Sequence, residues 1–481
     1  MGDEAAERKR LSHAPSDRAV IAVLLAIGLC ASFLFTVVVP IQGRLPELLG
    51  ASREDTAWVL TSTLLVSAVV TPISGRLGDM YGKRRIILWL LVVTALGSLV
   101  VALTSNIAVV IAGRALQGAM AGTIPLGIAV MRDVLPLGKI DTAIATMSAT
   151  MGVGGSLGLP LSAIVTQYLD WHALFWLTGG FAIAAFVLVL RVIPVSVLRT
   201  AGRFDYLGAA GLTVVLGSVL LAISRGDLWG WTSPLTLGFG FGGLALGLLW
   251  FWYQLRAKTP LLDLRVAARR PVLLTNLASI AMGFAFFASS VVYPQLLELP
   301  VESGVGFGQS LVVASLVVMP SGIIMMLLSP VAGRIAREIG PKVLLVMGAA
   351  ALVIAYGFSI FFHDSIWHLL VANIIMGFGS GFGYAAMPML IMRSVPQNET
   401  GASNGLNALF RSLGTVIASA VMGAVLAASA AAASTGMPTA GGFQLTFVLG
   451  IAAALAALVL AIFIPTEPAR EERHPALPAD V

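Results

Sequence analysis

The stretch GRLGDMYGKRR, from Gly75 to Arg85, lies between two long apolar runs of a 481-residue chain. It holds four cations and one acid in eleven residues, whereas the neighbouring runs carry almost no charge. Across the chain 58% of residues are hydrophobic and 11% are charged, compared with about 25% charged in a soluble protein. The composition therefore predicts an integral membrane protein, in which apolar stretches of about 20 residues cross the bilayer as helices.

Hydropathy along the chain predicts an all-α fold with fourteen transmembrane helices. The predicted spans are residues 20–40, 56–75, 86–105, 107–131, 143–167, 172–193, 206–224, 235–254, 272–297, 308–331, 343–362, 366–392, 401–428 and 443–465.

The positions of Lys and Arg predict how the chain is oriented in the membrane. Most cations fall on the side that the two termini share; the exceptions are Arg44, Arg53 and Arg225 on the opposite side, and Arg114 and Arg411 inside spans. Loop cations mark the cytoplasmic side. An excess of Arg over Lys also favours a bacterial source, so we expect a multi-pass protein of a bacterial plasma membrane with both termini cytoplasmic. The net charge of +6 reflects this orientation and does not indicate nucleic-acid binding.

The opening stretch is repeated later in the chain. SPVAGRIAREIGPK (329–342) echoes TPISGRLGDMYGKR (71–84), and ANIIMGFGSG (372–381) echoes GRALQGAMAG (113–122). The repeat predicts two pseudo-symmetric six-helix bundles around an inserted pair of helices, and repeated halves with a cavity between them are typical of transporters. The predicted parts are an N-terminal tail (1–19), an N-terminal bundle (20–193), a linker region with the two extra helices (194–271), a C-terminal bundle (272–465) and a C-terminal tail (466–481).

Two short patterns carry a resemblance to a known family. Gly-x-Leu-x-Asp-x-x-Gly-Arg/Lys-Arg/Lys is matched by Gly75, Leu77, Asp79, Gly82, Lys83 and Arg84, and Arg-x-x-Gln-Gly is matched by Arg114, Gln117 and Gly118. The chain thus resembles the major facilitator superfamily. Its fourteen spans and the phrase WVLTSTLLVSAVVTPISGRLGD (58–79) are similar to the fourteen-helix drug:proton antiporter branch. The resemblance implies that the loop acts as a cytoplasmic latch and that Arg114 is linked to proton coupling.

The sequence departs from that branch at three places. The fifth span reads GGSLGLPLSA (154–163), so Pro160 is one place later than in the exporter pattern Gly-Pro-x-x-Gly-Gly. The first span contains SFLFTVVVP (32–40) and lacks the acid that is frequent there. In the second copy of the loop, Arg337 stands where the first copy has Asp79.

The loop has features that membrane orientation alone does not explain. Gly75 and Gly82 allow helices and a tight turn to approach closely. Asp79 accepts hydrogen bonds only, so it can pair with a neighbouring Arg or cap a facing helix N-terminus, in one conformational state and not in another. The orientation of the chain in the membrane is enough to explain the positive charges of Arg84 and Arg85. We therefore predict a gating loop made of Gly75, Arg76, Asp79, Gly82, Lys83 and Arg84.

Arg114 lies inside a predicted span, where a charge costs at least roughly 2.5–3.5 kcal/mol. Gln117 follows three residues later on the same helical face. Two interpretations remain open: the guanidinium is satisfied by backbone carbonyls, or it faces a cavity and tunes protonation. No acid lies near the middle of any predicted span, and Glu298 is the nearest acidic candidate at the outer end of the ninth. Arg114, Gln117 and Glu298 are the residues predicted for proton coupling or the cavity.

Asn404, Asn407 and Arg411 share one face of the thirteenth span. A stripe of polar side chains must face the bundle or water rather than lipid. Two roles remain open for it: hydrogen bonding between helices and lining of a substrate cavity. Flexible and aromatic side chains supply adaptable apolar surface. The predicted cavity residues are Met147, Met151, Phe284, Phe287, Phe382, Tyr384, Asn404, Asn407 and Arg411. Small residues and a proline predict sites of close packing and flexing at Gly118, Gly122, Gly154, Gly158 and Pro160.

These features together predict a secondary active transporter that exports small amphipathic or hydrophobic molecules by alternating access. The sequence contains no nucleotide-binding loop, so we expect a proton gradient as the energy source and no cofactor or bound metal. The expected partners are a small-molecule substrate, protons and membrane lipid, with the chain acting as a monomer. An importer or facilitator of a small metabolite is the alternative. An enzyme is not expected, because no cluster of acid–base or nucleophilic groups stands out within the spans.

Overall fold

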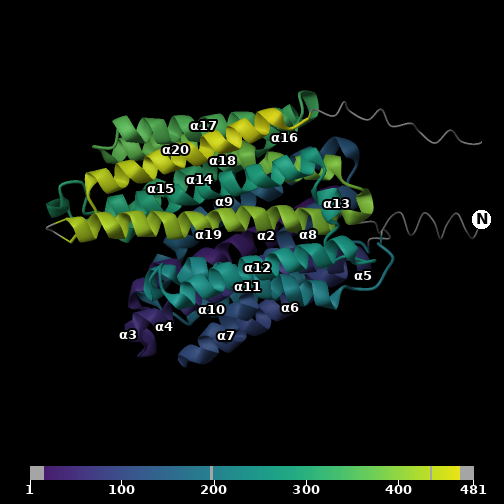
Figure 1. The fold of residues 1–481 in the computed structure, drawn as a ribbon, viewed down its shortest axis with the longest axis horizontal. Coiled ribbons are helices and arrows are strands. Elements are labelled where there is room, and N and C mark those ends of the chain that lie inside the picture. Colours follow the sequence, from purple (N-terminus) through teal and green to yellow (C-terminus); the bar gives the residue numbers. More distant parts are fainter. Residues whose placement is uncertain (1–15, 196–198, 434–435, 466–481) are drawn as a thin grey trace, which may run out of the picture.

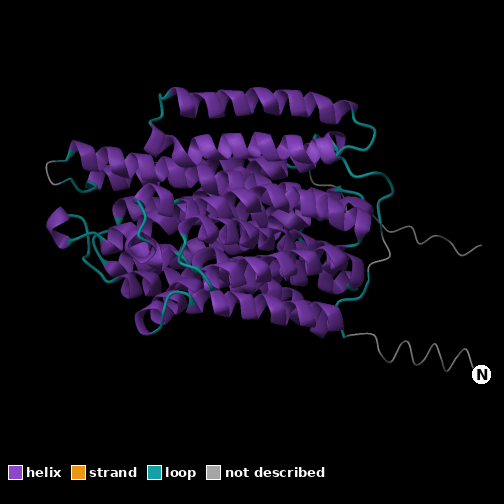
Figure 2. Cartoon of the chain, turned by 90° about the horizontal axis from the view of Figure 1, so that it is seen from below, coloured by secondary structure: helices purple, strands orange, loops and turns teal. Residues whose placement is uncertain are grey.

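The computed structural model describes residues 16–195, 199–433 and 436–465. Within these residues every regular element is a helix, and most helices run alongside one another in one bundle (Figures 1 and 2). Among the described residues, thirteen helices are long and apolar enough to cross a membrane, and there are fourteen crossings when the bent pair counts as one span. The predicted all-α membrane fold with fourteen spans is confirmed.

Six crossings make up the first half of the bundle. They are α2 (Asp17–Thr36), α5 (Trp58–Tyr81), α6 (Lys83–Ala102), the continuous run of α7 (Ile107–Gln117), η2 (Gly118–Gly122) and α8 (Thr123–Val134), then α9 (Leu137–Tyr168) and α10 (Ala173–Val192). The short helices η1 (Val39–Arg44), α3 (Leu45–Leu49) and α4 (Arg53–Thr56) connect α2 to α5.

The inserted pair, α11 (Tyr206–Trp229) and α12 (Pro234–Arg256), precedes the second half. That half consists of α14 (Arg270–Glu298), the bent pair α15 (Leu311–Leu327) and α16 (Ser329–Glu338), α17 (Pro341–Phe361), α18 (Ile366–Ser394), α19 (Thr400–Ala432) and α20 (Ala440–Phe463). The short helices α13 (Leu264–Ala267), η3 (Val301–Ser303) and η4 (Gln397–Glu399) lie in its connections. In Figure 1, α17 and α20 lie along one edge, α6 and α7 lie along the other, and α19 runs between them.

Both copies of the repeated loop make the same backbone turn. Gly82 separates α5 from α6 with φ +102°, and Gly340 separates α16 from α17 with φ +106°. This region of φ favours glycine, because an L side chain is strained there. We call the end of the bundle that carries these two turns the motif end; it lies at the right of Figure 1, near the labels α5 and α13.

The tenth span differs from the single helix predicted over 308–331. Helices α15 and α16 meet at an angle of 41° around Leu328. Pro330 opens α16 and has no N–H to donate to the preceding turn, which favours a break at this point. Its repeat counterpart, Pro72, lies inside α5, which continues as one helix to Tyr81.

Two seams join the halves, and the repeat relates them. In the first seam α5 packs along α19. A Cβ atom at Gly75 would lie 2.2 Å from the carbonyl oxygen of Gly401, and one at Gly405 would lie 2.7 Å from that of Thr71. The two backbones therefore touch at the motif end, and side chains larger than hydrogen would force them apart.

In the second seam α9 packs along α15 and α16. A Cβ atom at Gly322 would lie 2.4 Å from the carbonyl oxygen of Gly152, and one at Gly333 would lie 2.5 Å from Thr142. Gly333 is the repeat counterpart of Gly75. Small residues at helix contacts permit this close packing in membranes, where burial of apolar surface gives little drive for association.

The inserted pair packs over the first seam. Leu212, Leu216 and Leu220 of α11 share an apolar cluster with Ala68 of α5 and Leu406 of α19. At the far end of α11, the guanidinium of Arg225 lies 4.1 Å from the ring centre of Trp58, at the start of α5. Helix α11 therefore contacts both halves, whereas most of α12 faces outward.

The glycine contact at the first seam yields a testable prediction. In Gly75→Val the new side chain overlaps the Gly401 backbone, so α5 and α19 must separate at the motif end. Overpacking of this kind costs about 1–3 kcal/mol, which corresponds to a rise of about tenfold in the open fraction. Ser403→Cys, placed in a background where the buried Cys30 is serine, should react faster with a maleimide by a similar factor.

Gly423→Val is the matched control, because a Cβ atom at Gly423 of α19 meets nothing within 4 Å. Equal labelling rates in wild type, Gly75→Val and Gly423→Val would contradict the role assigned to this contact.

Candidate functional site

Asp79 caps the first turn of α19 from across the first seam. Its Oδ1 accepts a hydrogen bond from the Gly401 N–H at 3.0 Å, and its Oδ2 accepts one from the Ala402 N–H at 2.7 Å. The residue before α19, Glu399, provides no side-chain cap. First-turn N–H groups have no partner within their own helix, and a carboxylate there also meets the positive end of the helix dipole. Of the two contacts predicted for Asp79, the cap on a facing helix N-terminus is the one present in the structure.

The cations of the loop are fixed in different ways. Lys83 is buried and donates to Oδ2 of Asp133 at 2.6 Å, with Oδ1 of Asp79 3.8 Å away. Arg84 donates to the carbonyl oxygen of Leu190 at 2.6 Å, which ties the loop to the end of α10. A buried ammonium requires this kind of pairing, because an unpaired charge in the interior is costly. Asp133, at the end of α8, was not among the predicted site residues.

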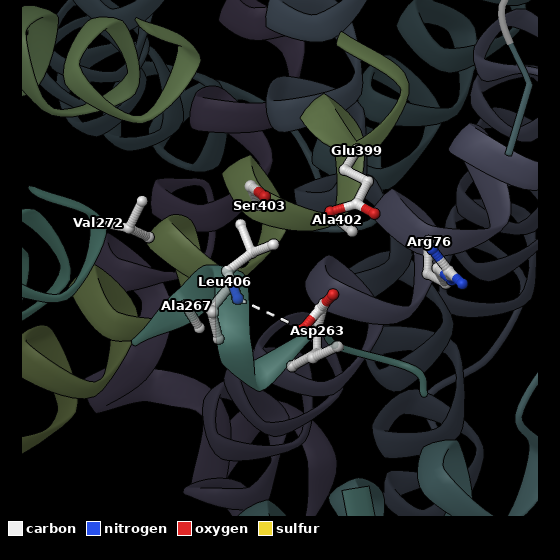
Figure 3. A pocket seen from close by; sticks show the side chains of 10 residues that line it. Arg76, Asp263, Ala267, Val272, Glu399, Ala402, Ser403 and Leu406 are labelled. Carbon is white, nitrogen blue, oxygen red and sulfur yellow. Dashed lines mark hydrogen bonds between the residues drawn. The ribbon is translucent and has the colours of Figure 1, made fainter. Parts of the chain in front are cut away.

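Arg76 lies beside the cap rather than in it. Figure 3 shows Arg76, Asp263 and Glu399 around one cavity at the motif end, which Ala402 and Ser403 of α19 also line. Asp263 belongs to the segment before α13, where its side chain accepts from the backbone N–H groups of Arg265 and Val266. The loop motif, the start of α19 and the linker to the second half therefore meet at one place.

The second seam carries its own polar contacts at the motif end. Arg337, the repeat counterpart of Asp79, donates to the carbonyl oxygen of Gly138 in the first turn of α9 at 2.7 Å. Arg393 of α18 pairs with Asp141 of α9 at 2.9 Å and donates to the carbonyl of Ala336 at 3.0 Å. The second copy of the loop lacks the acceptor but still bonds across to the other half, with a donor.

Arg114 lies buried inside the first half. Its Nη1 donates to Oε1 of Gln117 at 2.6 Å and to the carbonyl of Leu34 at 3.4 Å, and its Nε donates to the carbonyl of Val59 at 3.2 Å. Gln117 in turn donates to the hydroxyl of Ser98 at 2.7 Å. The guanidinium of Arg114 therefore donates to backbone carbonyls, as the first of the two interpretations expects. Glu298 ends α14 in the other half.

A polar and aromatic group forms where α14, α18 and α19 meet. Asn407 donates to Oδ1 of Asn276 at 3.0 Å and to the hydroxyl of Ser279 at 2.8 Å. The guanidinium of Arg411 lies 5.1 Å from the ring centre of Tyr384, a distance at which a cation is attracted to an aromatic face. Asn407 thus makes hydrogen bonds between helices. The predicted cavity residues Tyr384 and Arg411 contact each other.

The other predicted cavity residues are distributed between the halves. Met147 is fully buried between Gly28 of α2 and Gly127 of α8, so it fills the core of the first half. Asn404 and Phe382 are buried in the second half. Three more are partly buried and pack against the main apolar cluster: Met151, Phe284 and Phe287.

The predicted flexing residues lie at close helix contacts. Gly118 and Gly122 bound the 3₁₀ segment η2, and Cβ atoms there would lie 2.6 Å from the Thr63 carbonyl oxygen and 2.2 Å from the Ser74 hydroxyl. Gly154 and Gly158 place α9 against α2 in the same way. Pro160 lies inside α9, which continues to Tyr168.

Sequence reasoning identified Asp79 but missed its partners. Gly401 and Ala402 are the last two residues of PQNETGA (396–402), where proline and polar residues give the usual signal of a helix start. That signal indicates that unpaired N–H groups are present, but it does not say which acid reaches them. No pattern in the sequence predicted the two ion pairs at the motif end, Lys83 with Asp133 and Arg393 with Asp141.

Comparison with known proteins places the chain in a family. The model of the Major Facilitator Superfamily matches residues 24–204 and 206–419. The chain is 26% identical over 418 residues to "Multidrug resistance protein Stp" of Mycobacterium tuberculosis, covering 85% of this chain and 76% of that protein. It is 26% identical over 425 residues to the "Tetracenomycin C resistance and export protein" of Streptomyces glaucescens, covering 83% and 74%. It is 25% identical over 459 residues to "Lincomycin resistance protein LmrB" of Listeria monocytogenes, covering 92% and 96%.

Solved structures show the same fold. The human organic anion transporter MFSD10 (TETRAN) matches with a TM-score of 0.63 and 16% identity, covering 92% of this chain and all of that one. The proton:xylose symporter XylE matches with a TM-score of 0.63 and 13% identity, covering 93% and 96%. Because the family model matches most of the chain, the chain belongs to the Major Facilitator Superfamily.

Proposed function

We propose that this chain is a secondary active transporter that exports small amphipathic or hydrophobic molecules by alternating access. Relatives that cover most of the chain are named for resistance to several drugs, for tetracenomycin C resistance and export, and for lincomycin resistance. The observation that carries the mechanism is the cap that Asp79 places on α19. That cap joins the two halves, and rocking of the halves about a central site must break it.

The motif end is proposed to face the cytoplasm. Lys83, Arg84 and Arg85 lie there together with Arg337 and Lys342 of the second copy, and loop cations favour the cytoplasmic side. In a bacterial plasma membrane this orientation places both termini inside the cell. In this orientation the capped motif end is the closed cytoplasmic gate, and an alternating-access exporter must close that gate before it releases a molecule to the outside.

A proton gradient is proposed as the energy source, with no cofactor. One proton that enters across 100 mV yields about 2.3 kcal/mol, and about 1.4 kcal/mol corresponds to tenfold in concentration. A single proton would therefore sustain roughly a fifty-fold gradient of a neutral substrate. Expression in a pump-deficient bacterial host should lower the accumulation of hydrophobic dyes and antibiotics, and a protonophore should abolish the difference.

The same assay separates export from its alternative. The fifth span departs from the exporter pattern around Pro160, which favours an importer or a facilitator of a small metabolite. Substrate accumulation is therefore measured in both membrane orientations. Uptake into right-side-out cells that exceeds the empty-vector control would replace the export proposal by import.

Asp79→Asn tests the gate directly. The amide keeps one oxygen acceptor but turns an NH₂ group toward a first-turn N–H, and it loses the charge that the helix end favours. We expect normal membrane insertion with transport reduced by about tenfold, since hydrogen bonds to charged groups contribute about 1.5–3 kcal/mol. Asp55→Asn, in the short helix α4 at the opposite end of the bundle from the gate, is the control, because the Asp55 side chain is exposed. Full transport activity in Asp79→Asn would reduce the loop to an orientation signal.

Arg114→Ala tests proton coupling against structural support. If Arg114 tunes protonation, the variant should still move substrate down its gradient but should lose substrate-driven proton flux in vesicles. If it only satisfies the carbonyls of Leu34 and Val59, the two activities should fall together with the amount of folded protein. Equal proton fluxes in wild type and Arg114→Ala would remove Arg114 from the coupling mechanism.

A further inference from the structure

One residue of the linker after the first half bonds both halves at the gate. The backbone N–H of Thr200 donates to the carbonyl oxygen of Asp79 at 2.7 Å. Its hydroxyl donates to the carbonyl oxygen of Asn398 at 2.6 Å. Asp79 lies in the last turn of α5, and Asn398 lies in η4 just before α19. Thr200 therefore bridges α5 and η4, the short helix that leads directly into α19, beside the contact that the Asp79 carboxylate makes.

The chain that carries Thr200 is anchored five residues later. The buried carboxylate of Asp205 accepts from the Gly208 N–H at 2.7 Å, the Tyr253 hydroxyl at 2.9 Å, the Gln254 amide at 2.8 Å and the Leu261 N–H at 3.2 Å. These groups belong to α11, to α12 and to the segment that follows α12. A buried carboxylate with several donors holds its partners firmly, because separating them leaves a charge unsatisfied. The position of Thr200 is thus tied to the inserted pair.

We propose that Thr200 is a positioning residue of the gate, through which the inserted pair α11–α12 stabilises the closed motif end. When α5 separates from α19 and from η4 before it, Thr200 cannot keep its hydrogen bonds to both Asp79 and Asn398, so at least one of them exists only in the closed state. Asp205 holds the linker, and with it Thr200, to the inserted pair. The hydrogen bonds of Thr200 therefore let an element outside the two six-helix halves stabilise the closed state. The proposal assigns the two extra helices a part in the conformational equilibrium, and it rests on the gating role proposed above.

The distance across the motif end reports on this equilibrium without requiring transport. Arg85 of the first half and Glu338 of the second are both exposed at that end. Spin labels are attached at cysteines in these two positions, in the full-length chain with Cys30 changed to serine and reconstituted in lipid. Pulsed electron resonance then gives the fractions of short and long distances, which correspond to the closed and open motif end.

Thr200→Val keeps the shape and the backbone N–H but removes the hydroxyl donor. One hydrogen bond contributes about 1 kcal/mol net, so the ratio of open to closed molecules should rise by about fivefold. Thr200→Ser keeps the donor and should resemble wild type. Thr213→Val is the matched control, because its hydroxyl bonds only within α11, to the carbonyl of Ala209. Identical distance distributions in Thr200→Val, Thr200→Ser and wild type would overturn the proposal.

Asp205→Asn tests the anchor separately, since Asp205 contacts neither Asp79 nor Asn398 through its bonded groups. The open fraction should rise in the same direction as in Thr200→Val. An unchanged distribution in Asp205→Asn would overturn the part assigned to the inserted pair. A wild-type chain that exports nothing, while Thr200→Val still shifts the distances, would refute the proposed function and leave the role of Thr200 at the motif end intact.

Discussion

A carboxylate at the end of one helix caps the beginning of another, and the closed arrangement of the two halves depends on that contact. Asp79 is almost fully buried, at 1% exposure, so its charge has little water to solvate it. Two N–H groups, the positive end of α19 and the nearby ammonium of Lys83 replace that water. The benefit is mutual, because α19 has no side-chain cap of its own. Separation of the halves leaves both partners to be solvated anew, which makes the contact suitable for a two-state gate.

The cap exists only because the backbones around it touch. Gly75, Gly401 and Gly405 remove the side chains that would otherwise hold α5 and α19 apart. A short side chain such as that of Asp79 can then reach backbone N–H groups on a different helix. The second seam has the same close approach at Gly333 but uses Arg337, a long donor, to reach the α9 backbone. The same position of the repeated loop thus makes two chemically different contacts across the seams, one through an acid and the other through a cation.

The inserted pair breaks the symmetry of the bundle on one side. Helix α11 covers the seam between α5 and α19 with leucines, and Arg225 adds a polar contact to α5 at the opposite end from the gate. The linker on either side of the pair reaches the motif end, through Thr200 before it and Asp263 after it. The pair is therefore attached to the seam between α5 and α19 at several points along its length.

The sequence by itself determined the number of crossings, the repeat, the turn at Gly82 and the likeness to a transporter family, because these depend on local hydropathy, on steric limits at one residue and on spacing along the chain. It also pointed to Asp79 as the unusual member of a basic loop. Only the tertiary structure decided what Asp79 binds, since Gly401 lies 322 residues away. It also placed the Arg114 guanidinium against carbonyls of neighbouring helices, and it showed that Pro330 accompanies a bend where Pro72 does not. In each case the outcome depends on which groups meet across helices, and no local pattern in the chain encodes that meeting.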